Sequence, residues 1–269
     1  IIIIGAGHNA KAHAIVYMPI IISGALLTFQ KKYLLGFLLS AIGMGMEIGA
    51  GHIQMTYYLG FCLLILGIVE LIEAVKNKNL ITFAKQVAVL LVAFIIGVGV
   101  NASRLMATKE YAEYSIRGKS ELTIDVDGKP KKKKFAGLDY DYITQYSYGK
   151  LETMNLLVPR FMGGGTIEEL GEGSNLFKEF EKMAGTEAAR AYSKESLTYW
   201  GDQPIVEAPA YIGAVVIFLF VLALFLVKGR LKWWLVGGIL LSLLLSYEYN
   251  SNGLVLNNLF KKIAQSRPI

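Results

Sequence analysis

The sequence predicts an α-helical polytopic membrane protein with about six transmembrane helices and an extracytoplasmic domain of mixed α/β structure. Hydrophobic residues make up 54% of the 269-residue chain. They gather in six blocks rather than in the amphipathic stripes of a soluble protein, as expected where lipid is the solvent. Residues 103–208 differ in composition, being rich in charged residues, Gly and Tyr, with no apolar run long enough to span. We therefore expect a domain outside the membrane there.

Three clusters of Lys and Arg between the apolar blocks predict the orientation. Alternate crossings place all three on one side, and basic residues beside helix ends stay in the cytoplasm. The clusters are Lys31 and Lys32; Lys76, Lys78 and Lys85; and Lys228, Arg230 and Lys232. Residues 103–208 are then extracytoplasmic, whatever charge they carry, because long loops translocate regardless of charge.

Residues 1–102 are predicted to contain an external segment and then four transmembrane helices. Small residues recur every four positions at Ala41, Gly45 and Gly49, a spacing that lets helices approach closely in lipid. The chain begins inside an apolar run, so we expect residues 1–4 to end an earlier helix of a longer protein; a short buried lead is the alternative. The four helices are expected at 12–29, 33–49, 53–73 and 83–100.

Residues 209–247 should add two transmembrane helices, at 209–227 and 232–247. Trp233 and Trp234 would lie in the aromatic belt at the inner interface. The tail, 248–269, is external and has no assigned structure. Cys62 is the only cysteine, which excludes an internal disulfide, and its place in an apolar run favours a packing role.

The external domain has signals for both strands and helices. Residues 121–126 alternate as a strand does and lead into Asp127-Gly128, a hairpin turn signal. Residues 139–159 and 175–194 are predicted to be helical, the second with one apolar face. These elements together predict the mixed α/β structure.

Charge and motifs exclude several function classes. The net charge of +6 comes from residues beside membrane segments and from one Lys run, without a nucleic-acid-binding motif, so we expect no nucleic acid partner. No Gly-rich phosphate loop, serine elbow or Cys metal motif occurs, which disfavours a cytosolic ATP-driven machine.

Polar residues gather at the external ends of the predicted helices, where placing a charge in lipid is costly. We interpret them as a polar site at the membrane surface for the head group of a lipid-linked substrate. The alternative is that they are ordinary polar groups of a membrane interface. This candidate donor site comprises Glu47, His52, Gln54, Arg104, Lys11 and His8.

The same residues raise the question of a metal site. His8, His52 and Glu47 could ligate a metal together, but they include no close-spaced pair of ligands. We therefore assign no metal site and no certain cofactor, although a divalent metal is compatible with the donor site.

A second set of residues in the external domain suits sugar binding. Trp beside Asp and Gln stacks on sugars and hydrogen-bonds to them. Acidic residues alternate with Tyr at the start of the helix predicted at 139–159, which also suits a helix N-cap. This candidate acceptor site comprises Asp139, Asp141, Tyr146, Glu152, Arg160, Trp200, Asp202 and Gln203.

These stretches also carry a family resemblance, which spans roughly residues 5–247. The chain resembles the YfhO-like bacterial membrane proteins, most closely those of Bacteroidetes type. The stretches are GHNAKAHAIVYMP, EIGAGHIQMTYYLGF, EYAEYSIRGKSEL, GLDYDYITQYSYG, NLLVPRFMGG, TYWGDQP and APAYIGAVVIFLFVLALFLVKGRLKWWL.

That family is similar to the GT-C glycosyltransferases, which take sugar from a polyprenyl-phosphate donor on the outer face of the membrane. The resemblance implies an inner-membrane protein that glycosylates a cell-envelope polymer, with Arg104 and Lys11 on the donor phosphate. GT-C enzymes carry the catalytic carboxylate on an early external loop, and this chain starts after that region, so no catalytic residue is assigned. Residues 248–269 depart from the family pattern.

The sequence leaves two other functions open. A transporter or lipid flippase would need a polar path through the midplane, and five of the six predicted helices have almost no charge at their centres. A non-catalytic scaffold for envelope assembly would need no catalytic carboxylate.

Overall fold

The computed structural model describes residues 7–115, 146–205 and 210–247. The chain divides into two compact units. Unit 1 comprises Ile1–Gly118 and Lys228–Leu241, and unit 2 comprises Lys119–Val227 and Ser242–Ile269.

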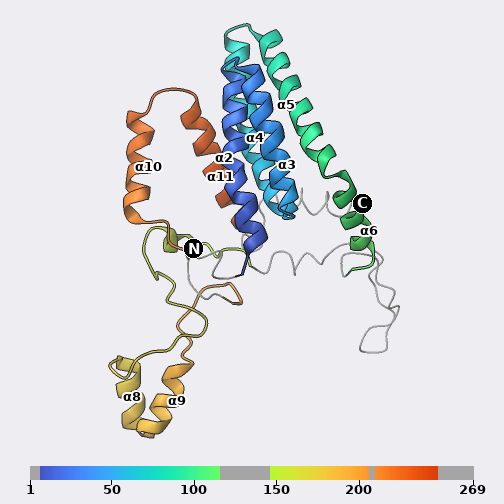
Figure 1. The fold of residues 1–269 in the computed structure, drawn as a ribbon. Coiled ribbons are helices and arrows are strands. Elements are labelled where there is room, and N and C mark those ends of the chain that lie inside the picture. Colours follow the sequence, from blue (N-terminus) through green and yellow to red (C-terminus); the bar gives the residue numbers. More distant parts are fainter. Residues whose placement is uncertain (1–6, 116–145, 206–209, 248–269) are drawn as a thin grey trace, which may run out of the picture. The chain divides into compact units, whose positions relative to one another are not determined.

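Unit 1 is a bundle of apolar helices. Figure 1 shows its first four helices running side by side. They are α2 (Asn9–Phe29), α3 (Tyr33–Gly49), α4 (Ile53–Lys76) and α5 (Leu80–Val100), followed by α6 (Ala102–Glu113). Unit 1 also contains α11 (Leu231–Ser246) as far as Leu241.

Three of these helices, α2, α4 and α5, are long and apolar enough to cross a membrane, with mean hydropathies of 1.8, 2.2 and 2.2. α3 and α11 have 17 and 16 residues, and 17 residues is about the lower limit for a spanning helix. Large apolar side chains face outward along the bundle, including Leu91, Ile95 and Val100 of α5. An exposed apolar surface of this extent suits a lipid environment.

The predicted helices 12–29, 33–49, 53–73, 83–100 and 232–247 are all present, the second with the predicted ends and the others with shifted ends. α2 begins at Asn9, so Lys11 lies inside the helix rather than before it. α4 extends to Lys76 and α5 begins at Leu80. Lys is a good helix former and its long side chain reaches the interface from within a helix, so α2 includes Lys11 and α4 includes Lys76. The residues added to the start of α5 are uncharged.

α2 and α3 approach each other closely through small residues. A Cβ on Gly36 would lie 2.7 Å from the carbonyl oxygen of Gly24 and 2.8 Å from the amide nitrogen of Thr28. On the other side of α3, Gly97 of α5 packs against Met44 and Gly45. A Cβ on Gly45 itself would meet only Val100, at 3.9 Å, so the close approach depends on Gly97 rather than on the predicted Gly45. The α2–α3 contact through Gly24 and Gly36 was not foreseen.

α11 is attached to α4 by polar contacts as well as by packing. The Arg230 guanidinium lies 2.7 Å from the Glu70 carboxylate, and Trp234 Nε1 donates to the Cys62 carbonyl over 2.8 Å. Trp234 is 9% exposed and packs with Ala25 and Leu66. The prediction of an interfacial Trp pair is wrong for Trp234, because its ring fills the bundle core.

Unit 2 is helical and irregular in the part that the structure describes. Its elements are the 3₁₀ helix η1 (Glu152–Leu156), α8 (Asn175–Ala184), α9 (Thr186–Lys194) and α10 (Ala214–Leu226). Two isolated β-bridges join its loops, Gly163 to Tyr199 and Glu168 to Ser196. No strand occurs among its described residues, so the mixed α/β prediction is not supported there; the predicted strand at 121–126 lies outside them.

The two predicted helices of the external domain also differ. In 139–159 the described part, from residue 146, contains only the 3₁₀ helix η1, whose Glu152 carboxylate accepts the N–H of Asp202 at 3.1 Å. In 175–194 the helix breaks at Gly185, whose φ of +83° ends α8. α8 and α9 then pack face to face, with Phe180 and Tyr192 stacked at 4.2 Å.

The helix predicted at 209–227 is shorter in the structure. α10 has 13 residues and begins after Gly213, which has a φ of +113°. Thirteen helical residues span about 20 Å, less than the roughly 30 Å hydrocarbon core.

Candidate functional site

A buried carboxylate lies where α3 ends. Glu47 is fully buried, two residues before the last residue of α3. The Thr56 hydroxyl of α4 donates to both of its oxygens, at 3.1 and 2.9 Å. A carboxylate in such a place needs a polar partner, because burial removes the hydration of its charge.

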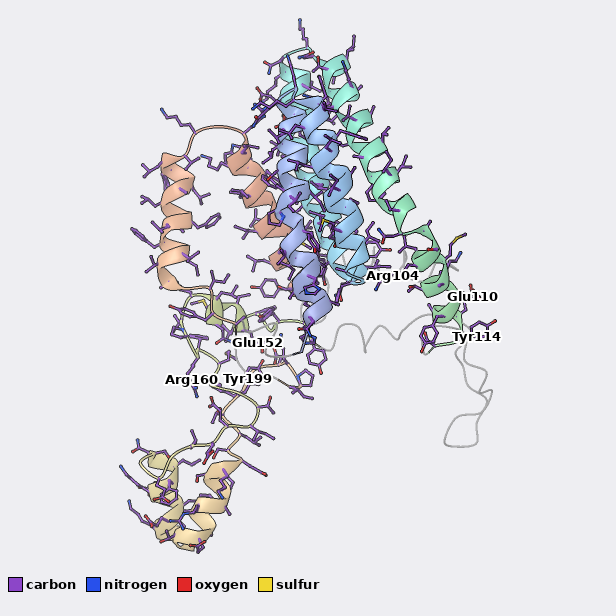
Figure 2. All side chains as sticks on the ribbon, viewed as in Figure 1. Arg104, Glu110, Tyr114, Glu152, Arg160 and Tyr199 are labelled. Carbon is purple, nitrogen blue, oxygen red and sulfur yellow. The ribbon has the colours of Figure 1, made fainter. Side chains whose placement is uncertain are left out.

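Residues from the α5–α6 junction meet the same helix end. Asn101 donates to the carbonyls of Gly45 at 2.9 Å and Gly97 at 3.2 Å. The Arg104 guanidinium donates to the Gly49 carbonyl. The Gly49 carbonyl is one of the last four of α3, which lack partners within the helix and carry partial negative charge, so the Arg104 contact stabilises the α3 terminus. The Asn101 amide joins α3 to α5 through the Gly45 and Gly97 carbonyls. Figure 2 labels Arg104 at the start of α6.

The turn between α3 and α4 places a histidine beside these groups. Gly51 adopts φ +78°, and a Cβ there would collide with the Arg104 guanidinium, so the guanidinium lies against a bare backbone. His52 precedes α4, and its Nδ1 is buried without a hydrogen-bond partner among the described residues. We call Glu47, His52, Thr56, Asn101 and Arg104 the α3–α4 cluster.

The remaining predicted donor residues lie outside this cluster. Gln54 is exposed and pairs with Tyr58 on the next turn of α4, with 2.6 Å between Nε2 and the phenol oxygen. His8 precedes α2 and Lys11 lies in its first turn, and neither side chain bonds to another described residue. The α2–α3 register places the start of α2 at the same end of unit 1 as the α3–α4 cluster, because Gly24 faces Ser40 and Ile21 faces Gly43.

The α3–α4 cluster could bind an anion, because the Arg104 guanidinium has donors that are not occupied. Arg104 is exposed, and its contact with Gly49 uses one of the five N–H donors of a guanidinium. The other donors form no bond within the described part of unit 1. Arg can bind a phosphate through two parallel hydrogen bonds, so the free donors suit a phosphate group.

Unit 2 contains a second cluster, built on the buried carboxylate of Glu152, which is 1% exposed. Glu152 accepts from the backbone N–H groups of Gly149 and Asp202. Gln203 spans the same region, because its Nε2 donates to the Tyr146 carbonyl at 3.0 Å and its N–H reaches the Tyr199 hydroxyl at 3.2 Å. We call Glu152, Asp202, Gln203, Tyr146 and Tyr199 the Glu152 cluster.

Two neighbouring groups in unit 2 have shifted pKa values. The buried position of Tyr148, and then the nearby Glu152 carboxylate, raise the pKa of its phenol. Hydrogen bonds from Arg160 and then Thr198 lower the pKa of Glu168 to about 2. The Arg160–Glu168 pair is bidentate, with N–O distances of 2.8 and 2.6 Å, so Arg160 is already engaged by a carboxylate.

The predicted acceptor residues of unit 2 therefore separate by role. Tyr146, Glu152, Asp202 and Gln203 are joined by the hydrogen bonds given above. Figure 2 labels Glu152 and Tyr199 of this cluster. Glu152 holds two loops and has no exposed carboxylate, so its evident role is structural. The Trp200 side chain is 70% exposed and follows Tyr199 directly. Asp139 and Asp141 lie outside the described residues.

The described residues bring no three His, Cys, Asp or Glu side chains together in a way that could hold a metal ion. This applies to His8, His52 and Glu47, the three ligands considered from the sequence.

Sequence reasoning selected some residues of these clusters and missed others. Glu47, His52 and Arg104 were selected because they are polar at helix ends. Thr56 and Asn101 were not included in the donor site, although both are polar and lie at the same helix ends. Thr198, which donates to Glu168 over 2.7 Å, gave no local signal, because its partner lies 30 residues away.

Comparison with known proteins identifies no relative of the chain. No protein-family model matches the chain, and no curated protein or solved structure matches it. The described helices therefore define only a broad class: a mostly helical protein with three helices that are long and apolar enough to cross a membrane.

Proposed function

We propose that this chain is part of a glycosyltransferase-like protein of the bacterial cytoplasmic membrane, which binds a polyprenyl-phosphate sugar at the α3–α4 cluster. The sugar would pass to a cell-envelope polymer on the outer face. The observation that carries the proposal is the exposed Arg104 guanidinium, which contacts the Gly49 carbonyl at the end of α3 and keeps its other donors free of partners among the described residues. The resemblance to YfhO-like proteins supplies the reaction class.

The residues of the cluster take different roles in this proposal. Arg104 binds the donor phosphate through its free N–H donors, and Lys11 adds a second positive charge from the start of α2. His52 is partly exposed and lines the site, but its Nδ1 is buried, so we assign that nitrogen no contact with the substrate. Glu47 has no exposed oxygen, so we assign it a positioning role: with Thr56 it holds α3 against the start of α4. The base that deprotonates the acceptor is not assigned to any residue here.

The proposed orientation rests on the ends of the helices. Lys31 and Lys32 lie between α2 and α3, and Lys76 and Lys78 lie at the end of α4. All four are at the opposite end of α3 or α4 from the α3–α4 cluster. If basic ends face the cytoplasm, the cluster faces outward, where a translocated lipid-linked donor is available.

The acceptor would bind at unit 2 in this proposal. The exposed Trp200 ring offers a stacking surface, and Asp202 and Gln203 follow it on the same loop. Asp139 and Asp141 are kept as candidates on sequence grounds. Tyr146 contributes a backbone contact to Gln203, while Glu152 and Arg160 hold the loops on which the other residues lie.

Charge distribution disfavours the transporter and flippase alternatives. In the described helices α2 to α5, charged side chains occur only within about two turns of a helix end. α10 has none. A polar path through the midplane requires ionisable or broken segments there.

Glycan transfer in cells tests the proposal. The Arg104→Ala variant should lose glycosylation of the envelope polymer while the protein stays in the membrane, and Glu47→Gln should reduce it. Lys109→Ala and Glu110→Gln are matched controls, because both residues are exposed on α6 and bond to no other described side chain. Normal transfer by Arg104→Ala would contradict the proposal.

A further inference from the structure

A groove runs between α3 and α5 at the end of unit 1 opposite the α3–α4 cluster. It has a volume of about 410 Å³, within the roughly 300–1,000 Å³ of small-ligand sites. Its lining is almost wholly apolar apart from one ammonium group. The lining residues are Tyr33, Leu34 and Phe37 of α3 and Lys85, Ala88, Val89 and Val92 of α5.

The ammonium of Lys85 lies 4.7 Å from the centre of the Tyr33 ring. Within the described residues this ring is its contact, and no carboxylate pairs with it. A cation over an aromatic ring keeps its charge and its three N–H donors. The groove therefore has an apolar channel and, at one end, a positive charge open to an anion.

The surroundings of the groove strengthen this positive character. α3 and α5 both begin at this end, so their N-termini add partial positive charge. Glu70, one of the two acidic residues here, already pairs with Arg230, and Glu73 accepts from Asn77. The eight basic residues are Lys31, Lys32, Lys76, Lys78, Lys85, Lys228, Arg230 and Lys232.

We propose that the α3–α5 groove binds an anionic phospholipid, with an acyl chain along Phe37, Val89 and Val92 and the phosphate at Lys85. Basic pockets between transmembrane helices on the cytoplasmic side bind such head groups. An apolar helix from a second copy would cover the channel but leave the Lys85 charge facing hydrocarbon, which is costly. An anionic phospholipid suits both the apolar channel and the Lys85 charge, because its acyl chain is apolar and its phosphate lies at the depth of the interface.

Native mass spectrometry of the purified chain tests the proposal with equal amounts of phosphatidylglycerol and phosphatidylcholine. The wild-type chain should retain phosphatidylglycerol preferentially. Lys85→Met keeps the apolar stem and removes the charge, so the preference should fall about five-fold, the effect of about 1 kcal/mol per basic residue near a membrane surface. Lys76→Met removes a charge at the same end without touching the groove, and should keep the preference.

A second variant tests the channel itself. Ala88→Phe fills the groove and leaves Lys85 in place, so it should reduce retention of both lipids. The proposal is overturned if Lys85→Met keeps the wild-type preference, or if Lys76→Met lowers it as much, because diffuse charge would then explain the preference. It is also overturned if the wild-type chain is a lipid-free dimer that Ala88→Phe dissociates. These outcomes are independent of glycan transfer, because the groove lies at the other end of α3.

Discussion

Replacing Gly36 by Ala should separate α2 from α3. The new Cβ would lie 2.7 Å from the Gly24 carbonyl oxygen and 2.8 Å from the Thr28 nitrogen. Both are backbone atoms, so no side-chain rotation relieves the clash. Ordinary contact begins at 3.4 Å, so the helices must move apart by about 0.7 Å, a gap that forfeits roughly a quarter to a half of each dispersion contact.

The expected cost is about 1–3 kcal/mol of unfolding free energy, the usual range for overpacking. Gly60→Ala is the matched control, because a Cβ at this position of α4 meets nothing within 4 Å. Both variants gain the same helix propensity, about 1 kcal/mol in water. The difference between the two variants therefore isolates the clash.

Reversible unfolding in mixed detergent micelles measures this difference. Gly36→Ala should be the less stable variant by about 1–3 kcal/mol. If it is as stable as Gly60→Ala, the backbones of α2 and α3 are not in close contact, and the packing described for unit 1 is wrong.

Two further predictions concern charged pairs. Arg230→Gln should lower the unfolding free energy by about 1–3 kcal/mol, because it leaves the Glu70 carboxylate, 8% exposed, without its cation. In a double-mutant cycle, the variant that also contains Glu70→Gln should recover most of this loss. If the effects of the two substitutions simply add, the two side chains are not paired. For Glu168, the folded pKa of about 2 lies below the ordinary 4.5, so its pairing stabilises unit 2 above pH 4.5 and this contribution is lost as pH falls towards 2. Between pH 6 and pH 3 the unfolding free energy of wild type should fall by about 1 kcal/mol more than that of Glu168→Gln, a value reduced for the exposure of Arg160. Thermal scans that show the same pH dependence for both proteins would contradict this prediction.

The helices of unit 1 could be predicted because lipid imposes a simple pattern on sequence. Within its described residues, the apolar blocks predicted at 12–29, 33–49, 53–73 and 83–100 are all helices, and the loops that contain Lys31 and Lys78 end them within a few residues of the expected positions. Close packing was harder to predict. Gly45 belongs to a series of small residues spaced four apart, but a Cβ there would have room. The close contact at Gly36 joins it to Gly24 and Thr28 of another helix, and the spacing within one helix does not reveal such partners.

Unit 2 was less predictable because tertiary contacts shape it. The local sequence around Glu152 favours a helix, yet its carboxylate binds the N–H of Asp202, 50 residues further along the chain. No local pattern reveals such a partner. The break at Gly185 is different, since a glycine after an apolar helical stretch is a usual C-terminal signal and could have been used.

The same limits apply to the candidate site. Polar residues at helix ends pointed to Glu47 and Arg104, but the sequence could not tell which of them is open to a ligand. The structure separates them, because Glu47 is fully buried and Arg104 is exposed.

Binding of a polyprenyl-phosphate sugar to the purified chain tests the central claim most directly. Wild type should bind the phosphate-linked sugar and not the phosphate-free polyprenol. Arg104→Ala should weaken binding about ten-fold or more, since hydrogen bonds to a charged group contribute about 1.5–3 kcal/mol, while Lys109→Ala should bind as wild type does. Equal affinities of Arg104→Ala and Lys109→Ala, or binding of polyprenol as tight as that of its phosphate, would contradict a donor site at the α3–α4 cluster.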